Sequence, residues 1–240
     1  MGKECTRGEA VTLIRLHVVV EGQTEEGFLN EVVAPELGAL GIFIDTHSIT
    51  TGRKRGRLFR GGWGSYGQLR RDLLRWMKQD QNPDAWFSTM VDLYGLPNDF
   101  PGHTECQKLP DPRQRVLCLE EHLALDIRDG LAGGAAHQRF IPYIQLHEFE
   151  ALLFADPGMF LKAFPEEGQI VAQLQAIRAR FQSPEHIDDG QATAPSKRIL
   201  DLLPGYVKTV SGILILKYIG LDALRRECPH FNEWMAKIGQ

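Results

Sequence analysis

Three acidic residues stand just after apolar segments of this sequence, and their positions indicate metal chemistry. Glu21 and Asp92 come directly after short apolar runs, and Glu150 comes shortly after a third. Such runs are typical of buried parallel strands, where a following carboxylate is costly unless it is solvated, paired or bound to a cation. Ligands of open α/β sheets bind outside the carboxyl ends of the strands. We therefore expect the three carboxylates to meet at one sheet edge and to bind Mg²⁺ (or Mn²⁺).

A divalent cation at this edge would support phosphoryl-transfer chemistry. It would lower the pKa of a bound water and neutralise charge on a phosphodiester in its transition state. Glu21 and Asp92 are the expected metal ligands and catalytic residues. Glu148 and Glu150 would reach the same edge from the start of a following helix as further metal ligands, and Glu150 is also an expected catalytic residue. Glu25 follows a helix-start signal, so it can equally be a first-turn acid that suits the helix dipole.

A basic segment, residues 51–76, lies between the first two acidic positions. Its composition predicts a mobile loop over residues 52–67, with Trp63 and Tyr66 placed to stack on bases. A flexible solvated loop without a ligand explains the same composition. The candidate nucleic-acid contacts in this segment are Arg53, Lys54, Arg55, Arg57 and Arg60.

Two further cations begin a predicted helix after Pro195. Lys197 and Arg198 can bind phosphate there, and Lys197 can also stabilise developing charge, because helix N-termini attract anions. They are equally explained as surface cations. Tyr206 and Lys208, in a following turn, are similarly placed but carry a weaker signal.

The elements that must position these residues alternate between strands and helices. We expect strands over residues 16–20, 41–45, 85–91 and 140–146, with helices over 24–37, 66–77 and 113–127. This alternation predicts an α/β, Rossmann-like fold with a mainly parallel four-stranded sheet flanked by helices. The sequence after Pro157 has mostly helical patterns. We therefore predict an α/β domain over residues 12–156 and a helical extension over 157–240 that packs on it.

Composition excludes several classes of protein. The chain has 240 residues and a net charge of -4, which argues against a uniformly basic coat for nucleic acid. It has no apolar run of the roughly 18 residues that span a bilayer and no signal-peptide pattern, so we expect a cytoplasmic protein without membrane contact. The four cysteines form no zinc spacing with histidines and are expected to be reduced, unpaired thiols. No P-loop or serine-hydrolase motif is present.

Several segments together carry a family resemblance. The Glu-Gly-x-Thr-Glu sequence at residues 21–25, with an aspartate ending a later strand, resembles the TOPRIM domain of topoisomerases, primases and certain nucleases. Five segments in order resemble more closely a bacterial TOPRIM-like family catalogued as domain of unknown function 4276. They are VEGQTE at 20–25, VDLYGLP at 91–97, LHEFEALLF at 146–154, PSKR at 195–198 and CPHF at 228–231.

The TOPRIM resemblance implies specific roles for the acids. It makes Glu21 and Glu25 metal ligands and matches Asp92 to the first aspartate of an Asp-x-Asp pair. The second aspartate is absent, because Leu93 and Tyr94 follow Asp92. Either Asp99 from the next loop or Glu150 would replace it. The setting of Glu150 resembles a metal-binding glutamate in nucleases of the overcoming-lysogenisation-defect type.

The leading hypothesis is a Mg²⁺-dependent TOPRIM-type nuclease that hydrolyses DNA or RNA. The resemblance also implies a partner, a separately encoded ATPase of the ABC or structural-maintenance-of-chromosomes type, with the nuclease as effector of an anti-phage defence system. The alternative is a metal-binding but non-cleaving module for nucleic acid or a partner protein, which the missing aspartate favours. A phosphotransferase or phosphatase fits the acids but leaves the basic segment without a role. The sequence does not indicate an oligomeric state.

Overall fold

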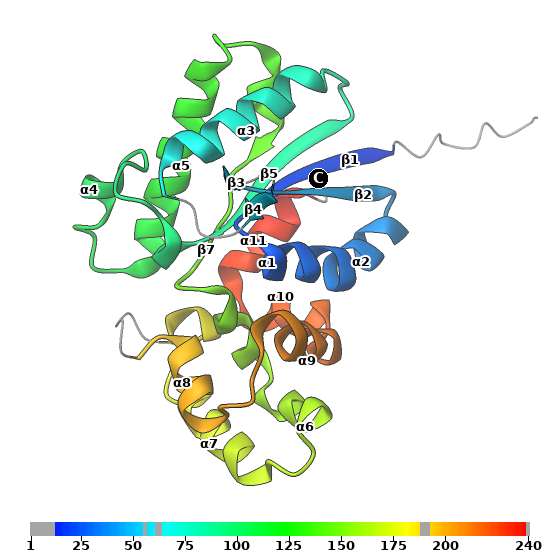
Figure 1. Cartoon of the computed structure of the whole chain (residues 1–240), viewed down its shortest axis with the longest axis vertical. Coiled ribbons are helices and arrows are strands. Elements are labelled where there is room, and N and C mark those ends of the chain that lie inside the picture. The colour runs from blue at the N-terminus through cyan, green and yellow to red at the C-terminus, as the bar shows by residue number, and fades with distance from the viewer. Residues whose placement is uncertain (1–12, 55–56, 61–63, 188–192, 239–240) are drawn as a thin grey trace, which may run out of the picture.

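A parallel sheet forms the centre of the computed structural model, which describes residues 13–54, 57–60, 64–187 and 193–238 (Figure 1). Its strands are β1 (Ile14–Val20), β2 (Ile42–Ser48), β5 (Ala85–Asp92), β6 (Phe140–Ile141) and β7 (Ile144–Gln145). The order is β2-β1-β5-β6, β7 also pairs with β5, and every one of these pairs is parallel. This confirms the predicted α/β fold with a mainly parallel sheet. The predicted fourth strand is split into the two short strands β6 and β7.

Helices cover both faces of the sheet because its strands are apolar on both sides. Helices α1 (Gln23–Phe28) and α2 (Ala34–Ala39) lie on one face, and α3 (Tyr66–Gln79) and α5 (Pro112–Gly130) lie on the other (Figure 1). Successive side chains of a strand point to opposite faces. Leu16, Val18 and Val20 accordingly belong to one core cluster, whereas Val19 belongs to the other.

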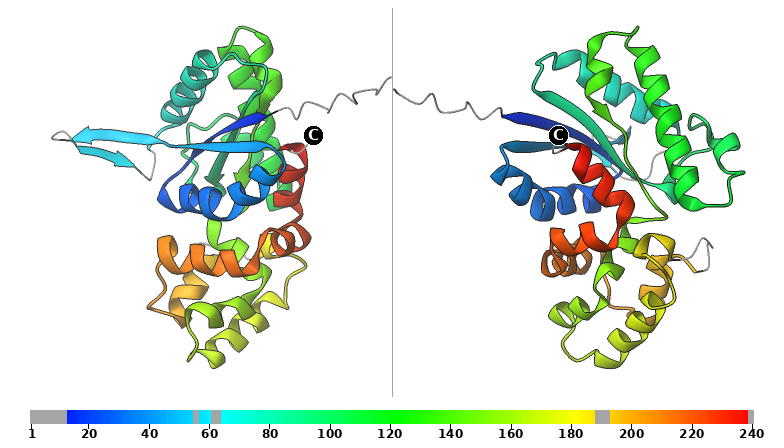
Figure 2. Two further views of the ribbon diagram at one scale, coloured as in Figure 1. Left: turned by 90° about the vertical axis from the view of Figure 1, so that its right-hand side faces the viewer. Right: turned by 180° about the vertical axis from the view of Figure 1, so that it is seen from behind.

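The C-terminal part of the chain is helical, as predicted. Its helices are α6 (Phe160–Ala163), α7 (Gly168–Arg178), α8 (Pro195–Leu202), α9 (Ile213–Ile219), α10 (Leu221–Glu227) and α11 (Pro229–Ile238). The boundary at residue 157 stays a prediction, because one core cluster contains side chains from β1, α1 and these helices alike. Figure 2 shows α6–α10 gathered at one end of the molecule, with α11 running up beside the sheet.

Short irregular helices complete the described chain. Stretches of 3₁₀ helix lie at Leu93–Gly95, Ala135–Arg139, Phe149–Ala155, Pro157–Met159 and Pro184–His186, and α4 (His103–Cys106) is a single turn. Two π-helical turns lie at Leu29–Val33 and Lys208–Gly212. Such turns are frequent at functional sites. The second of them carries a lysine that reaches the edge of the sheet, as described below.

Helix α11 is fixed to the sheet by Trp234, through both its aromatic ring and its indole N–H. Trp234 is 2 % exposed, stacks on Tyr143 with ring centroids 4.6 Å apart, and donates from Nε1 to Ser88 Oγ at 2.9 Å. Ser88, on β5, in turn donates to the carbonyl of Ile141 on β6. The last helix and two strands therefore share one buried contact.

The basic segment contains a β-hairpin where we had expected a mobile loop. Strands β3 (Thr50–Lys54) and β4 (Arg57–Arg60) pair antiparallel and project from the body of the molecule (Figure 2). Threonine, leucine and phenylalanine in these strands favour extended backbone. All five candidate contacts of this segment lie outside the described residues: Arg55 entirely, and Arg53, Lys54, Arg57 and Arg60 in their side chains. The nucleic-acid role of these residues stays a prediction.

The expectation of four unpaired thiols was wrong for two of them. Cys106 and Cys118 form a disulfide, because the packing of α4 against α5 brings their Cα atoms to 5.7 Å. Cys228 is free and buried, and Cys5 lies outside the described residues. Among the helices that the structure describes, none is both long and apolar enough to cross a membrane.

Shortening Trp234 tests how firmly α11 is held on the sheet. We expect Trp234→Ala to lower the free energy of unfolding by about 3–5 kcal/mol, because it leaves a cavity and removes a buried donor. Trp234→Phe keeps most of the ring volume and should cost only about 1–2 kcal/mol. Urea unfolding followed by circular dichroism measures both. A cost below about 1 kcal/mol for the alanine variant would show that α11 is not part of the cooperative core.

Candidate active site

The carboxyl ends of β1 and β5 bring the first two acids together. The strands are parallel neighbours, with Val20 opposite Met90, so Glu21 and Asp92 follow at the same edge. The backbone N–H of Asp92 donates to Glu21 Oε2 at 3.3 Å. Crossovers in a parallel sheet place residues 71 positions apart in the sequence side by side.

A glycine makes room for the Glu21 carboxylate. A Cβ atom at Gly95 would lie 2.6 Å from Glu21 Oε2 and 3.1 Å from Oε1. A side chain at this position would therefore push the carboxylate out of place. Glycine at residue 95 thus leaves room for the Glu21 carboxylate in its present position beneath the 3₁₀ turn.

Glu25 caps the first turn of α1 and also faces Lys208. Its Oε2 accepts a hydrogen bond from the N–H of Gly22 at 3.0 Å, which satisfies a free donor at the start of α1. Its Oε1 faces inward, 3.6 Å from Lys208 Nζ, and the residue is only 4 % exposed. A first-turn acid of this helix therefore also contributes charge to the site.

Glu150 reaches the same place from the 3₁₀ helix Phe149–Ala155. It is 3 % exposed, and its Oε2 lies 3.3 Å from Lys208 Nζ. We call Glu21, Glu25, Asp92 and Glu150 the acidic cluster. Its members come from the ends of β1 and β5, from α1 and from the segment after β7.

Lys208 is the basic residue at the centre of this cluster, and sequence reasoning gave it too little weight. Its Nζ lies 3.3–3.6 Å from oxygens of Glu150, Asp92 and Glu25, and 5.3 Å from the centroid of the Phe149 ring. It begins the π-helical turn that leads into α9. The signal that could have found it is the turn at Gly205 and Tyr206, which places a lysine just before a predicted helix.

The electrostatics of the cluster favour an additional cation. Burial raises the pKa of Asp92 well above its ordinary value, and the charges of Glu25, Glu21 and Glu150 add to the increase, against the attraction of Lys208. Burial likewise raises the pKa of Glu150 to about 7. Burial alone would lower the pKa of Lys208, but Asp92, Glu150 and Glu25 outweigh it and raise the pKa. One ammonium therefore offsets only part of the carboxylate charge.

One buried oxygen of the cluster lacks a hydrogen bond, which fits a site for a cation. Asp92 Oδ1 is buried without a donor, because Lys208 contacts the other oxygen of this carboxylate. Such an unsatisfied carboxylate oxygen is costly unless a cation binds it. The carboxylates are spread around the ammonium, so no three of their oxygens within the described residues lie within 4.8 Å of one another. Closer convergence would require Lys208 to withdraw.

A cleft of about 640 Å³ lies beside the acidic cluster. Tyr94, two residues after Asp92, and Glu148, two residues before Glu150, both line it. The carboxylate of Glu148 accepts from the N–H of Ser196, at the N-terminus of α8. The basic side chains in its wall are His103, Arg115 and Lys197. Lys197, a predicted catalytic residue, therefore lies in this adjoining cleft and not among the contacts of the acidic cluster.

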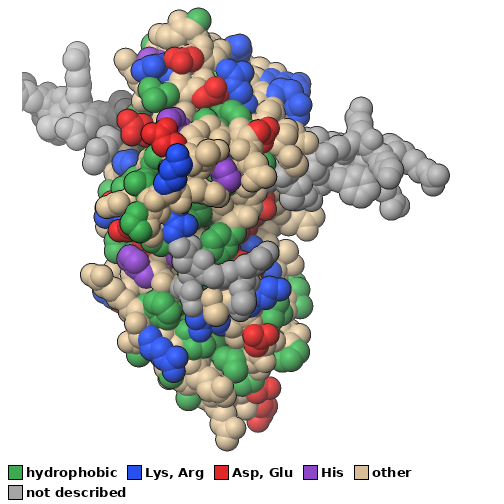
Figure 3. Space-filling view, turned by 90° about the vertical axis from the view of Figure 1, so that its left-hand side faces the viewer, with side chains coloured by type: hydrophobic (Ala, Val, Ile, Leu, Met, Phe, Trp, Pro, Cys, Tyr) green, Lys and Arg blue, Asp and Glu red, His purple; other side chains and the backbone are tan. Residues whose placement is uncertain are grey.

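Other predicted residues have different positions. Asp99 lies at the start of α3, where its Oδ1 accepts from the N–H of Tyr66 at 2.9 Å, and it is not among the described carboxylates around Lys208. Arg198 donates to the carbonyl of Thr193 and lies over the ring of Phe181. On the face in Figure 3, basic side chains are interspersed with acidic and hydrophobic ones over the described surface.

Replacing Glu150 with glutamine tests the charge cost of the cluster. Because the pKa of Glu150 rises from 4.5 to about 7, the folded chain keeps a proton that the unfolded chain releases in this window. The stability of the native chain therefore falls as the pH rises through it. In chelator, we expect Glu150→Gln to be more stable than wild type by up to about 3 kcal/mol at pH 8 and to match it closely at pH 4, below both pKa values.

Urea unfolding at the two pH values measures this difference. Glu36→Gln, an exposed glutamate on α2, is the matched control and should show no pH-dependent change. A difference for Glu150→Gln that is the same at both pH values would contradict the proton balance.

Comparison with known proteins assigns the chain to one family. It belongs to the family described as Domain of unknown function (DUF4276), which matches residues 20–239. The acidic cluster and Lys208 all lie within the matched residues. No curated protein and no solved structure matches the chain.

Proposed function

We propose that this protein is a Mg²⁺-dependent (or Mn²⁺-dependent) phosphodiester hydrolase acting on DNA or RNA. The observation that carries the proposal is the acidic cluster at the carboxyl edge of the sheet, in which three carboxylates from separate segments contact one ammonium and the fourth, Glu21, accepts from the N–H of Asp92. The resemblance of Glu21, Glu25 and Asp92 to TOPRIM nucleases supports the same chemistry. Glu150 takes the place of the missing second aspartate in this proposal.

The metal would be held by Glu21, Asp92 and Glu150, with Glu25 in support. When bound, it supplies charge neutralisation and a water of lowered pKa. Side chains of the protein would supply the other catalytic roles. Lys208 Nζ moves from the carboxylates to a phosphoryl oxygen and offsets the charge that develops there.

The adjoining cleft would bind the part of the nucleic acid next to the phosphodiester bond that is cleaved. Lys197 and Arg115 bring positive charge to its wall and would bind phosphates. The ring of Tyr94 is 40 % exposed and can stack on a base. His147, held in left-handed backbone with φ of 60°, hydrogen-bonds the Tyr94 hydroxyl through Nδ1 and so fixes the position of the ring.

The family resemblance also supports a proposed biological setting. Related TOPRIM nucleases work with an ATPase, fused or encoded separately. We therefore propose a separately encoded ATPase of the ABC or structural-maintenance-of-chromosomes type as partner, with this chain as the effector of an anti-phage defence system.

A second function, binding without cleavage, is favoured by one observation. Lys208 already pairs with three members of the acidic cluster, and such a pairing can replace a metal permanently. In that case the cleft would bind nucleic acid or a partner protein without hydrolysis.

A cleavage assay separates the two functions. Plasmid, single-stranded DNA and RNA are incubated with the purified chain in Mg²⁺, Mn²⁺ or chelator. We expect metal-dependent cleavage that falls about 100-fold or more in Glu21→Gln and Asp92→Asn, because each change removes a group that acts in the transition state. The exposed variant Glu36→Gln should keep full activity. Binding without cleavage in every metal would favour the second function, and cleavage that persists in both variants would overturn the site.

Replacing Lys208 with methionine tests the competition between ammonium and metal. The substitution keeps an unbranched side chain and removes the charge that the metal must displace. We expect Mg²⁺ to bind about tenfold more tightly, measured by calorimetry, while cleavage falls because the phosphoryl oxygen loses its cation. Weaker Mg²⁺ binding in Lys208→Met would contradict this role.

A further inference from the structure

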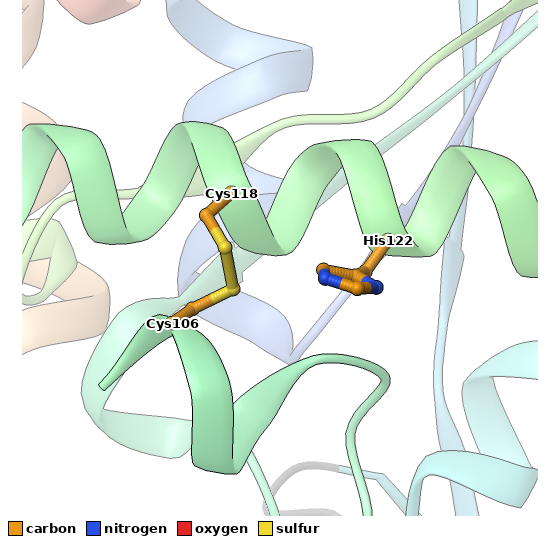
Figure 4. Close-up of side chains that lie close together, drawn as sticks. All are labelled: Cys106, Cys118 and His122. Carbon is orange, nitrogen blue, oxygen red and sulfur yellow. A yellow bond between two sulfur atoms is a disulfide. The ribbon is translucent and has the colours of Figure 1, made fainter. Parts of the chain in front are cut away.

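A second group of potential metal ligands lies where α4 packs against α5, apart from the acidic cluster. Cys106 is on α4, and Cys118 and His122 are on α5 (Figure 4). One ligand atom from each of the three lies within 4.8 Å of the others, and theirs is the one such group of cysteine, histidine and acidic side chains in the described part of the chain. The two sulfur atoms are joined in a disulfide.

The expectation that the cysteines form no zinc spacing with histidines overlooked two residues on α5, whose spacing lets them bind the same metal ion. Cys118 and His122 are four positions apart, so they lie on the same face of the helix one turn from each other. Figure 4 shows both on the side of α5 that faces α4, with Cys106 approaching from below. Thiolate sulfur and imidazole nitrogen are the ligands that Zn²⁺ prefers in proteins.

The backbone next to α4 is shaped around the His122 ring. Gly102 has a φ of 74°, and a Cβ atom there would lie 2.3 Å from the His122 Cδ2 atom. Glycine at this position therefore serves both the left-handed turn and the space for the imidazole. His122 Nε2 lies 3.7 Å from Oε2 of Glu105, which is also a residue of α4. The ring therefore lies against the start of α4, with an acidic side chain of the same helix close to its nitrogen.

We propose that the reduced thiols of Cys106 and Cys118, together with His122, form a Zn²⁺ site, with the Glu105 carboxylate as fourth ligand. The disulfide is the oxidised, metal-free state of the same residues. Zinc binds cysteine as the thiolate, and neither sulfur of a disulfide is a thiolate. The two states therefore exclude each other.

The conversion requires a dithiol reductant. Its thiolate attacks one sulfur, the Cys106–Cys118 bond breaks, and a mixed disulfide forms. The second thiol of the reductant then displaces the remaining cysteine and leaves the reductant as a cyclic disulfide. Two electrons and two protons pass to the protein, and Zn²⁺ binding releases the thiol protons again.

This site borders the cleft beside the acidic cluster. His103, at the start of α4, and Gln107, directly after Cys106, both line the cleft wall. Zinc or a disulfide at Cys106 therefore holds the segment that forms this wall.

Metal titration of the full chain tests the proposal. Cys5→Ser with Cys228→Ala leaves one pair of cysteines, and this background is compared after dithiol reduction and after oxidation. We expect the reduced form to bind one equivalent of Co²⁺ with thiolate charge-transfer absorption that Zn²⁺ bleaches, and the oxidised form to show none. The acidic cluster is present in both forms, so the difference between them reports the thiols alone.

Variants decide whether the site is built as proposed. His122→Ala should weaken Zn²⁺ binding at least tenfold, and Gly102→Ala, which keeps all ligands, should weaken it by displacing the ring. His137→Ala, at a histidine outside the group, should leave it unchanged. Equal Zn²⁺ affinity in the reduced and oxidised forms would overturn the proposal, as would full Zn²⁺ affinity and Co²⁺ absorption in a folded His122→Ala chain, confirmed by circular dichroism.

Discussion

The balance between one ammonium and four carboxylates is the interaction on which the site depends. Lys208 contacts Glu25, Asp92 and Glu150, and Asp92 holds Glu21 through its backbone N–H. Buried carboxylates at such distances repel one another, and without Lys208 their desolvation would oppose folding of this edge. The ammonium therefore keeps the acids together in the absence of a metal. It also occupies the position between the carboxylates where a divalent cation would bind and bring them closer together.

The rest of the fold places this interaction. Parallel pairing of β1 with β5 puts Glu21 beside Asp92, and the C-terminal helices carry Lys208 to them. These helices share a core cluster with β1 and α1. Trp234, in the same cluster, joins α11 to β5. The site is accordingly made from both ends of the chain, and the helical part after residue 157 supplies the cation that the acids need.

Much of the sheet edge could be predicted from the sequence, because its signals are local. Apolar runs followed by acids predicted the strands and the positions of Glu21 and Asp92. Contacts set by packing between distant elements could not be predicted in this way. Lys208 begins a π-helical turn that has no signature in the hydrophobic spacing, and Asp99 turned out to cap α3. The Cys106–Cys118 disulfide likewise depends on how α4 packs against α5. In the basic segment, the high charge suggested a loop although its other residues favour strands, which pair as a hairpin.

The most direct test of the account is anomalous diffraction from crystals of the full chain soaked with Mn²⁺. We expect an anomalous peak from a Mn²⁺ ion bound by Asp92 and Glu21 with Glu150 nearby, and a Lys208 ammonium that has moved away from the carboxylates. A crystal saturated with Mn²⁺ that shows no peak at the acidic cluster, with Lys208 still between Asp92 and Glu150, would contradict it.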